Sequence, residues 1–340
     1  MSSLVSPVPP LEAPHAGPAL FVLIKGYNMG SLWLAQAFSA KKGHALAFEY
    51  EHCLKASSRK NRAQNGTIQL DHPNVTIDFM KKVCACGDVK AKTQSCRICP
   101  LEHATDVHTC RASGISIASM GQSFIQHVQQ LRGVDPSISL VGLVRTNHVK
   151  HAISMLRRLC TKNSSMFNNH KISPTVSNGT MRVQPSALLA RTLTVTRGHA
   201  NFVEQVRLLR RDRPTHFVIY ERMQQNIDRE IGKLLQAVGV MHPFADLESR
   251  VSSLDRMVVK SSTEDLKQSL KNYREVEDYF GSFGESSTCF LPMLRAEGPV
   301  AFALDECAPK EAGRLEIRYA QFRGDFTCGG HCCNIRVHDM

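Results

Sequence analysis

The sequence predicts an α/β domain in which a mostly parallel central sheet is flanked by helices. Short apolar runs alternate along the chain with longer amphipathic segments, which is typical of strands alternating with helices. Several of the apolar runs have no polar face, as expected of parallel strands buried on both sides. The chain has 340 residues, 42% of them hydrophobic and 21% charged. This is enough for a large core and excludes a wholly disordered protein.

The N-terminal half contains the most regular predicted elements. Residues 1–18 include five prolines and are expected to form a flexible lead. A continuous apolar run at 21–24 predicts a buried strand, and a glycine-bounded turn at 25–31 leads into a helix over 32–42. Residues 45–50 are interpreted as a second strand.

The following segment, residues 55–112, is polar, basic and poor in periodic apolar positions. It is interpreted as a cysteine-rich insertion rather than as part of the core sheet. Regular structure resumes with a strand at 114–118, a helix at about 121–132 and a strand at 138–144. The last of these runs is apolar on both faces, which predicts a central parallel strand.

The helix after this strand has two distinct faces. Its apolar positions recur with the helical period: Val149, Ala152, Ile153, Leu156 and Leu159. Its opposite face is basic and is expected to be a surface that suits an anionic glycan: His148, Lys150, His151, Arg157 and Arg158.

The remaining elements follow the same alternation. They are a loop at 161–184, a helix at 185–211 interrupted near Gly198, a strand at 216–221, and helices at 228–238 and 263–279. Residues 286–340 have no strong period and are expected to form an irregular, cysteine-containing tail. The sequence therefore predicts one α/β domain over residues 19–285.

The net charge bears on the protein's binding partners, and the cysteines bear on its cellular compartment, but neither property is decided by them. The formal net charge of +12 favours anionic partners such as phosphorylated cofactors, acidic glycans or nucleic acid. No apolar run is long enough for a membrane helix. The twelve cysteines and the sequons at Asn65, Asn74, Asn163 and Asn178 fit a secretory compartment. We expect a cytoplasmic protein if the chain is complete and a Golgi lumenal one if a targeting segment is missing.

The turn at 25–31 is a candidate anion site. Backbone N–H groups at the start of a helix favour a negative ligand, Gly26 and Gly30 allow close approach, and the Ser31 hydroxyl can donate. A nucleoside triphosphate loop would need Lys-Ser/Thr after its last glycine, whereas Gly30 is followed by Ser31 and Leu32. Nucleoside triphosphate hydrolysis and kinase activity are therefore disfavoured.

Four segments, in order, resemble the signatures of sulfotransferases. Residues 30–34, Gly-Ser-Leu-Trp-Leu, are similar to the family's 5′-phosphosulfate loop. Residues 143–154 are similar to its second signature, in which an arginine ending a strand and a serine on the next helix bind the nucleotide 3′-phosphate. Residues 220–240 resemble its Tyr-Glu-Asp-Leu…Leu-Gly-Val segment, and residues 265–273 its Asp-Leu…Asn-Tyr helix.

The resemblance implies a P-loop-like three-layer sandwich and transfer of a sulfuryl group from 3′-phosphoadenosine 5′-phosphosulfate to an acceptor hydroxyl. It also implies the residues that bind this nucleotide: Gly26, Asn28, Gly30, Ser31, Leu32, Trp33, Arg145 and Ser154. Phe48-Glu49 is similar to the Phe-Glu-Pro segment of carbohydrate-type members, which favours a hydroxylated, anionic glycan as acceptor. Other acceptor classes stay open, and the sequence predicts no oligomeric state.

Two departures from the family bear on catalysis. The basic residue of the loop is replaced by Asn28, and a threonine is replaced by Leu32. Lys25, at the strand end, is the candidate replacement for the missing charge at the bridging oxygen. Glu49 is the first candidate for the general base that takes the acceptor's proton, with Glu51 and His52 as alternatives. The alternative is a catalytically impaired nucleotide- or glycan-binding relative.

The cysteine-rich segment has enough thiols for a structural zinc, at Cys84, Cys86, Cys96 and Cys99. Disulfides or free thiols are favoured over zinc because the Cys-x-Cys half-site is atypical. A zinc-stabilised nucleic-acid-binding protein is a further alternative. With one tryptophan, 6% aromatic residues and no recognisable reading module, the chain is not expected to bind nucleic acid.

Overall fold

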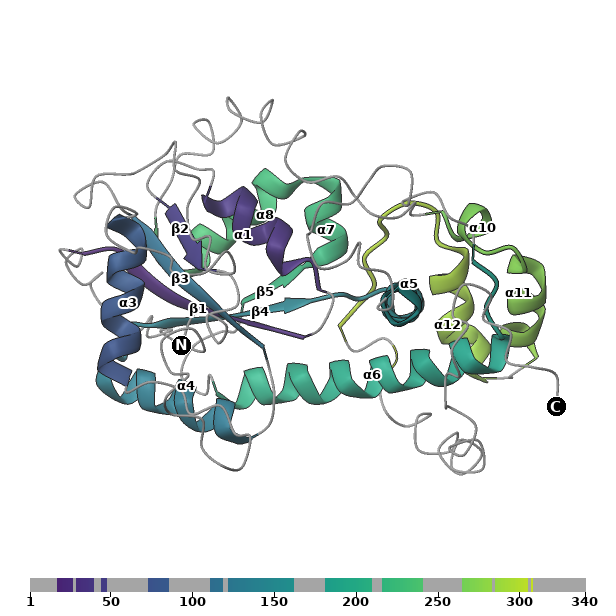
Figure 1. The fold of residues 1–340 in the computed structure, drawn as a ribbon, viewed down its shortest axis with the longest axis horizontal. Coiled ribbons are helices and arrows are strands. Elements are labelled where there is room, and N and C mark those ends of the chain that lie inside the picture. The colour runs from purple at the N-terminus through teal and green to yellow at the C-terminus, as the bar shows by residue number, and fades with distance from the viewer. Residues whose placement is uncertain are drawn as a thin grey trace, which may run out of the picture.

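The chain folds around a five-stranded sheet in which every pairing is parallel (Figure 1). The computed structural model describes residues 17–26, 29–39, 44–47, 73–85, 111–118, 122–161, 181–209, 216–240, 265–282, 285–304 and 307. The strands are β1 (Ala19–Lys25), β2 (His44–Ala47), β3 (Ala112–Ala118), β4 (Ser139–Val144) and β5 (His216–Ile219). Their order is β2-β3-β1-β4-β5. The predicted parallel α/β sheet is confirmed.

The register of the three strands β1, β4 and β5 places their carboxyl ends at one edge. Lys25, the last residue of β1, pairs with Leu143 of β4. Val144 of β4 pairs with Ile219, the last residue of β5. The segments that follow these strands therefore start side by side.

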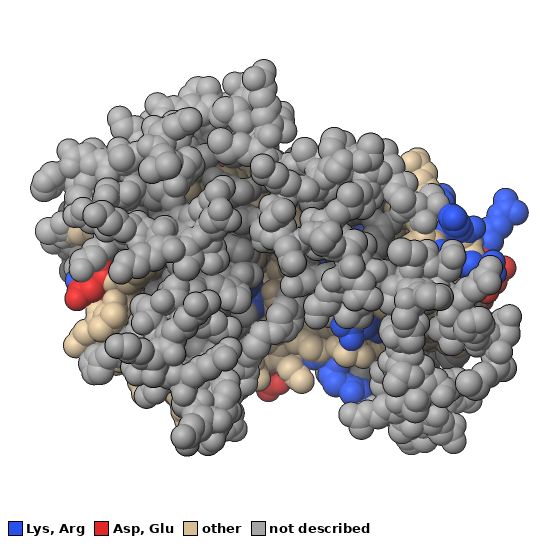
Figure 2. All heavy atoms as spheres, viewed as in Figure 1, with Lys and Arg blue, Asp and Glu red and all other residues tan. Residues whose placement is uncertain are grey.

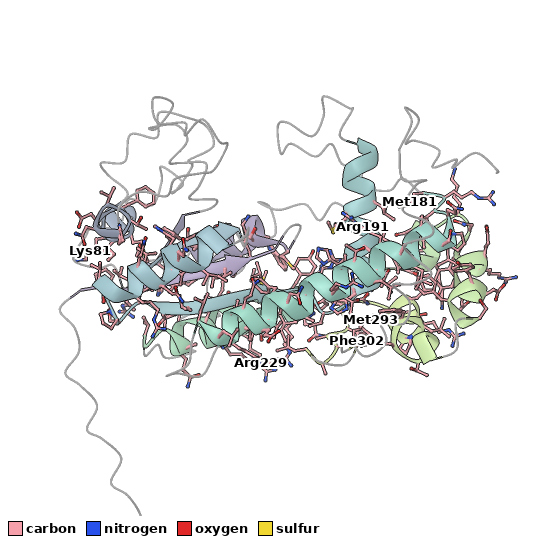
Figure 3. All side chains as sticks on the ribbon, turned by 90° about the horizontal axis from the view of Figure 1, so that it is seen from below. Lys81, Met181, Arg191, Arg229, Met293 and Phe302 are labelled. Carbon is pink, nitrogen blue, oxygen red and sulfur yellow. A yellow bond between two sulfur atoms is a disulfide. The ribbon has the colours of Figure 1, made fainter. Side chains whose placement is uncertain are left out.

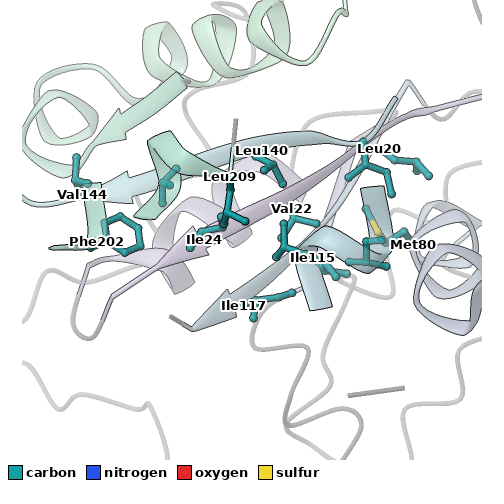
Figure 4. Packing of buried hydrophobic residues seen from close by; sticks show 14 of the residues in the cluster. Leu20, Val22, Ile24, Met80, Ile115, Ile117, Leu140, Val144, Phe202 and Leu209 are labelled. Carbon is teal, nitrogen blue, oxygen red and sulfur yellow. The ribbon is translucent and has the colours of Figure 1, made fainter. Parts of the chain in front are cut away.

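One face of the sheet is covered by α3 (Pro73–Ala85), α4 (Gln122–Val134) and α6 (Pro185–Leu208). Because strand side chains alternate between faces, Leu20, Val22 and Ile24 of β1 all point to this side. They pack with Met80 of α3 and Phe202 of α6, among others (Figure 4).

The other face is covered by α1 (Ser31–Ser39) and α8 (Ile227–Ala237). The alternate residues of β1, Phe21 and Leu23, point this way and pack with Phe38 and Ile231. The short helix α7 (Tyr220–Gln225) joins β5 to α8. The fold is thus the predicted three-layer sandwich.

A third core lies beyond the sheet, where helices pack on one another (Figure 1). Its elements are α5 (His148–Thr161), α10 (Leu266–Ser269), α11 (Tyr273–Gly281), α12 (Glu285–Arg295) and the N-terminal part of α6. A disulfide joins Cys289 of α12 to Cys307. Within the described ranges, the helices are all too short or too polar to span a membrane.

The predicted interruption of the long helix near Gly198 is wrong, because α6 runs unbroken through it. Gly198 is exposed, and the buried residues His199 and Phe202 anchor the next turn. The hydroxyl groups of Thr192 and Thr196 also bond to carbonyl groups four residues earlier, within the same helix. Packing outweighs the roughly 1 kcal/mol that a glycine costs a helix.

The predicted single helix at 263–279 is two helices. Asp265 caps α10 by accepting from the Lys267 N–H group. Leu270 is then extended and forms a parallel bridge with Met181. Met181 donates to the Ser269 carbonyl and accepts from the Lys271 N–H group. This pairing with a distant segment breaks the helix.

Three further differences concern segments without a strong sequence period. Within the segment interpreted as an insertion, α3 buries Ile77 and Met80 against the sheet. Residues 286–295, expected in an irregular tail, belong to α12, which contains Pro292. The strand expected at 216–221 ends two residues early because Tyr220 begins α7.

Candidate anion-binding site

The loop after β1 ends in a glycine that starts α1. Gly30 has a φ of 76°, a left-handed conformation that glycine adopts without a steric cost. Its carbonyl accepts the first helical hydrogen bond, from the Leu34 N–H group. The N–H groups of the first turn have no partner within the helix and are available to an anion. Ser31 is buried, and its hydroxyl makes no hydrogen bond within the described part of the chain.

Tyr220 packs directly against this loop. A Cβ atom on Gly30 would lie 2.3 Å from Cε2 of the Tyr220 ring. The rings of Trp33 and Tyr220 meet edge to face with centroids 6.2 Å apart. Because Tyr220 directly follows β5, it joins the end of that strand to the start of α1.

Arg145 is the first residue after β4, and its side chain also lies against Tyr220. Its guanidinium carbon is 4.7 Å from the centroid of the Tyr220 ring, a distance typical of a cation–π contact. Its Nε lies 3.7 Å from Oε1 of Glu221. Arg145 is only 7% exposed, yet in the described part of the chain it makes no hydrogen bond. A buried cation with unused donors fits an anionic ligand.

The N–H groups and side chains of Thr146 and Asn147, directly after Arg145, are all hydrogen-bonded. The N–H groups of Thr146 and Asn147 donate to Glu221 at 3.0 and 3.1 Å. Asn147 caps α5 by accepting from the Lys150 N–H group at 2.9 Å, and its amide donates to the Met293 carbonyl. Arg145 therefore extends from a rigid support.

The expected basic surface of α5 is wrong for the three residues of it that the structure describes, because His148, Lys150 and His151 are buried. Lys150 Nζ donates to the Gly298 carbonyl at 2.6 Å. Helices α6 and α12 both pack on α5, so it is enclosed on more than one side. Sequence periodicity identifies only one buried stripe, which explains the error.

His148 forms a buried contact with α6. Its Nε2 lies 2.7 Å from Nδ1 of His199, and its Nδ1 lies 3.0 Å from the Thr196 hydroxyl. Burial and the neighbouring His199 and His151 hold the pKa of His148 well below its usual value. His148 is therefore a neutral structural group near pH 7.

Figure 2 shows Lys and Arg side chains of the described chain in more than one place, one of them the end where α10 and α11 lie. The exposed basic residues of these two helices and of the turn between them are Lys267, Lys271 and Arg274. Acidic residues offset part of this charge: Lys267 pairs with Glu297 at 2.8 Å. Exposed pairs of this kind contribute little energy and do not mark a ligand site.

The structure brings together five of the predicted site residues at the carboxyl edge of the sheet: Lys25, Gly30, Ser31, Trp33 and Arg145. Lys25 is buried at the end of β1. Gly26 is close by in sequence, and a Cβ atom there would lie 2.7 Å from Cε of Met29. Arg145 is thus a further candidate for binding an anion beside the 25–31 turn, because Gly30 and Arg145 both lie against the Tyr220 ring.

Other predicted residues lie apart or outside the description. Ser154 follows the start of α5 by six residues, about 9 Å along the helix axis, and no hydrogen bond within the described chain joins it to Arg145. Asn28, Glu49, Cys86, Cys96 and Cys99 lie outside the described residues. Leu32 is in α1 and Cys84 in α3, with side chains that are not described. In the described ranges, no group of three or more His, Cys, Asp or Glu residues is arranged to hold a metal ion.

Tyr220, Glu221 and Thr146 were not among the predicted site residues. All three lie in segments that resemble family signatures, 143–154 and 220–240, but the resemblance gave them no role; their positions after a strand were a further signal. Ligands of open parallel sheets bind beyond the carboxyl ends of the strands. Sequence alone does not show that β5 lies beside β4, which is what brings these residues to Arg145.

The fold is that of a parallel α/β protein, and the residues described above form a candidate anion-binding edge. No protein-family model matches the chain, and no curated protein matches it. Solved structures do. The sulfotransferase from Alicyclobacillus acidocaldarius matches with 12% identity and a TM-score of 0.37, over 83% of this chain and 97% of that chain.

Two other matching structures differ in activity. Mouse sulfotransferase SULT7A1 complexed with PAP matches with 10% identity and a TM-score of 0.34, over 89% of this chain and 83% of that chain. A sugar kinase from Janibacter sp. HTCC2649 matches with 13% identity and a TM-score of 0.29, over 66% of this chain and 99% of that chain. Matches at these identities and TM-scores carry no functional conclusion for this chain.

Proposed function

We propose that this protein binds 3′-phosphoadenosine 5′-phosphosulfate and transfers its sulfuryl group to an acceptor hydroxyl. The observation that carries the proposal is Arg145, which is buried at the carboxyl end of a central strand with hydrogen-bond donors that the described chain does not use. A planar guanidinium is well suited to a phosphate. The ordered sulfotransferase-like segments of the sequence supply the nucleotide's identity.

The two parts of the site suit the two charged ends of this nucleotide. The start of α1, with Gly30 and Ser31, suits the 5′-phosphosulfate. Arg145 suits the 3′-phosphate. The Tyr220 ring contacts both parts, since it lies against Gly30 and Trp33 of the first and under the Arg145 guanidinium of the second.

In the proposed reaction, the acceptor oxygen forms a bond to sulfur as the bond from sulfur to the phosphate oxygen breaks. The products are a sulfate ester and 3′-phosphoadenosine 5′-phosphate. Negative charge develops on the leaving oxygen, where Lys25 is the candidate stabilising group. The acceptor's proton passes to a base, for which Glu49 is the sequence-based candidate, and a carbohydrate hydroxyl is the proposed acceptor.

Calorimetric titration with 3′-phosphoadenosine 5′-phosphate tests the nucleotide site. We expect the wild type to bind, Arg145→Ala to lose at least roughly tenfold in affinity, and Arg229→Ala to bind normally. Arg229 is an exposed arginine of α8 and serves as the matched control (Figure 3). A folded wild type that does not bind would rule out the proposal.

A nucleotide-binding protein without turnover is the second candidate, because Asn28 replaces the basic residue of the loop. Sulfate transfer from labelled 3′-phosphoadenosine 5′-phosphosulfate to a panel of glycans separates the two. If Lys25 supplies the missing charge, Lys25→Met lowers the transfer rate at saturating nucleotide. Binding without any transfer would favour the second candidate.

A further inference from the structure

We propose that Glu221 is a positioning residue, which holds the 145–147 turn so that Arg145 presents its terminal amino groups to a phosphate. The inference rests on the proposed nucleotide site and adds a residue that the sequence motifs did not assign. Glu221 is only 1% exposed, and it acts through Arg145 rather than on the ligand.

A single carboxylate contacts three consecutive residues. Oε2 of Glu221 accepts from both the N–H group and the hydroxyl of Thr146, each at 3.0 Å. Oε1 accepts from the Asn147 N–H group at 3.1 Å and lies 3.7 Å from Nε of Arg145. These contacts fix the backbone from which the Arg145 side chain starts.

Glu221 also determines where an anion can bind. Its carboxylate takes the N–H groups of Thr146 and Asn147, the two residues directly before α5. These N–H groups are therefore not available to an anion. The terminal amino groups of Arg145, which lies beside them, make no hydrogen bond within the described chain.

Arg145 is oriented without losing its donors. Tyr220 supports the face of the guanidinium. The 3.7 Å separation from Glu221 is an ion pair but is longer than a hydrogen bond. The guanidinium is thus held on a face and an edge, while its terminal amino groups make no hydrogen bond within the described chain.

The C-terminal segment supports the same turn from another direction. The Phe302 N–H group donates to the Thr146 hydroxyl at 3.0 Å, and the Met293 carbonyl accepts from Asn147. Met293 and Phe302 lie close together in Figure 3 and pack in the same apolar cluster. The Thr146 hydroxyl therefore links Glu221 to this segment. A substitution that removes this hydroxyl breaks both contacts and leaves the Glu221 side chain in place.

The test measures the affinity of two nucleotides for the full chain: 3′-phosphoadenosine 5′-phosphate, and adenosine 5′-phosphate, which lacks the 3′-phosphate. Glu221→Gln removes the charge and one acceptor. Thr146→Val removes the hydroxyl at nearly constant shape, and Thr146→Ser restores it. We expect the valine and glutamine variants to lose about tenfold for the first nucleotide and little for the second, with Thr146→Ser near wild type.

The ratio of the two affinities separates positioning from a merely structural role. Equal losses for both nucleotides, or no loss in any variant, would overturn the inference while leaving the nucleotide site intact. If Glu221→Gln does not fold, the comparison of Thr146→Val with Thr146→Ser tests the inference. A wild type that binds neither nucleotide, or an Arg145→Ala variant that binds as tightly as the wild type, overturns the proposed function and this inference with it.

Discussion

Gly30 is constrained twice, by its backbone conformation and by its neighbour. Its φ of 76° is strained for any residue with a Cβ atom, and that atom would lie 2.3 Å from the Tyr220 ring. We expect Gly30→Ala to lower the free energy of unfolding by about 1–3 kcal/mol and to weaken nucleotide binding at least roughly tenfold. Urea denaturation and calorimetric titration measure the two effects.

The matched control is Gly198→Ala. Gly198 lies within α6 and is exposed, and a Cβ atom added there would meet no other atom within 4 Å. Alanine there is expected to stabilise the protein by about 0.5–1 kcal/mol and to leave binding unchanged. If Gly30→Ala behaves like this control, the close contact between the loop and Tyr220 is not present in solution.

His127, on the buried side of α4, makes stability depend on pH. Burial lowers the pKa of His127 from 6.5 to about 4. As pH falls below about 6.5, the unfolded chain takes up a proton that the folded chain excludes. The His127 contribution is therefore fully present above pH 6.5 and is lost progressively as pH falls to about 4.

His127→Leu removes this dependence. We expect the variant to lose less stability than the wild type between pH 7 and pH 5, by about 2 kcal/mol. Comparing the two proteins by urea denaturation at each pH cancels the acid sensitivity of the carboxylates, which both retain. Parallel pH profiles for the two proteins would show that His127 is not buried as described.

At the scale of helices and strands, the pattern of apolar residues predicted the strands that are buried on both faces. β1 and β4 are apolar on both faces and buried throughout their centres, so their sequences alone identify them. The break between α10 and α11 was not predictable, because Leu270 pairs with Met181, which lies far away in the sequence. The burial of Lys150 likewise depends on Gly298, which belongs to another segment.

The candidate site was predictable in the same sense. Arg145 directly follows a recognisable strand, and Gly30 and Ser31 end the turn after another, so their place at a sheet edge follows from sequence. Tyr220 and Glu221 also follow a strand, but their contacts depend on the order of strands in the sheet. Sequence patterns contain the order of elements along the chain and not their order in space.

The disulfide between Cys289 and Cys307 closes a loop of the C-terminal segment with a sequence separation of 18 residues. A loop of this size corresponds to about 3 kcal/mol of stabilisation. Within the loop, Gly298 and Pro299 accept from Lys150 and Gln225. The disulfide therefore restrains the segment that packs beside the start of α5.

Replacing both cysteines by serine is expected to lower the free energy of unfolding by about 3 kcal/mol, measured by urea denaturation. A dithiol reductant, which is oxidised as it reduces the disulfide, should destabilise the wild type by a similar amount. The double variant should respond less to the reductant, which separates this disulfide from the chain's other cysteines. Equal responses of the two proteins would show that Cys289 and Cys307 are not joined.

At the scale of the whole molecule, the candidate site lies at the topological switch point of the sheet, between the adjacent strands β1 and β4. β1 leads to α1 on one face, whereas β4 leads through α5 to α6 on the other. Adjacent strands whose connections leave in opposite directions open a space at their carboxyl ends, where ligands of such folds bind. Lys25 is the last residue of β1, and Arg145 directly follows β4.

A nucleotide bound there would link parts of the fold that otherwise meet only through packing. It would contact α1 on one face of the sheet and Arg145, whose turn is bonded to the C-terminal segment. Any ligand that binds only the folded state stabilises it by mass action, by about 2.7 kcal/mol at roughly a hundred times its dissociation constant. We expect 3′-phosphoadenosine 5′-phosphate to stabilise the wild type by about this amount at that concentration.

Trp33 is the chain's single tryptophan, and its ring contacts Tyr220 beside Arg145. Unfolding followed by its fluorescence therefore reports on the site itself. At the same nucleotide concentration, Arg145→Ala should be stabilised less than the wild type, by about 1.4 kcal/mol for a tenfold loss of affinity, whereas Arg229→Ala should be stabilised like the wild type. If Arg145→Ala is stabilised as much as the wild type, Arg145 does not bind the 3′-phosphate, and the nucleotide binds elsewhere.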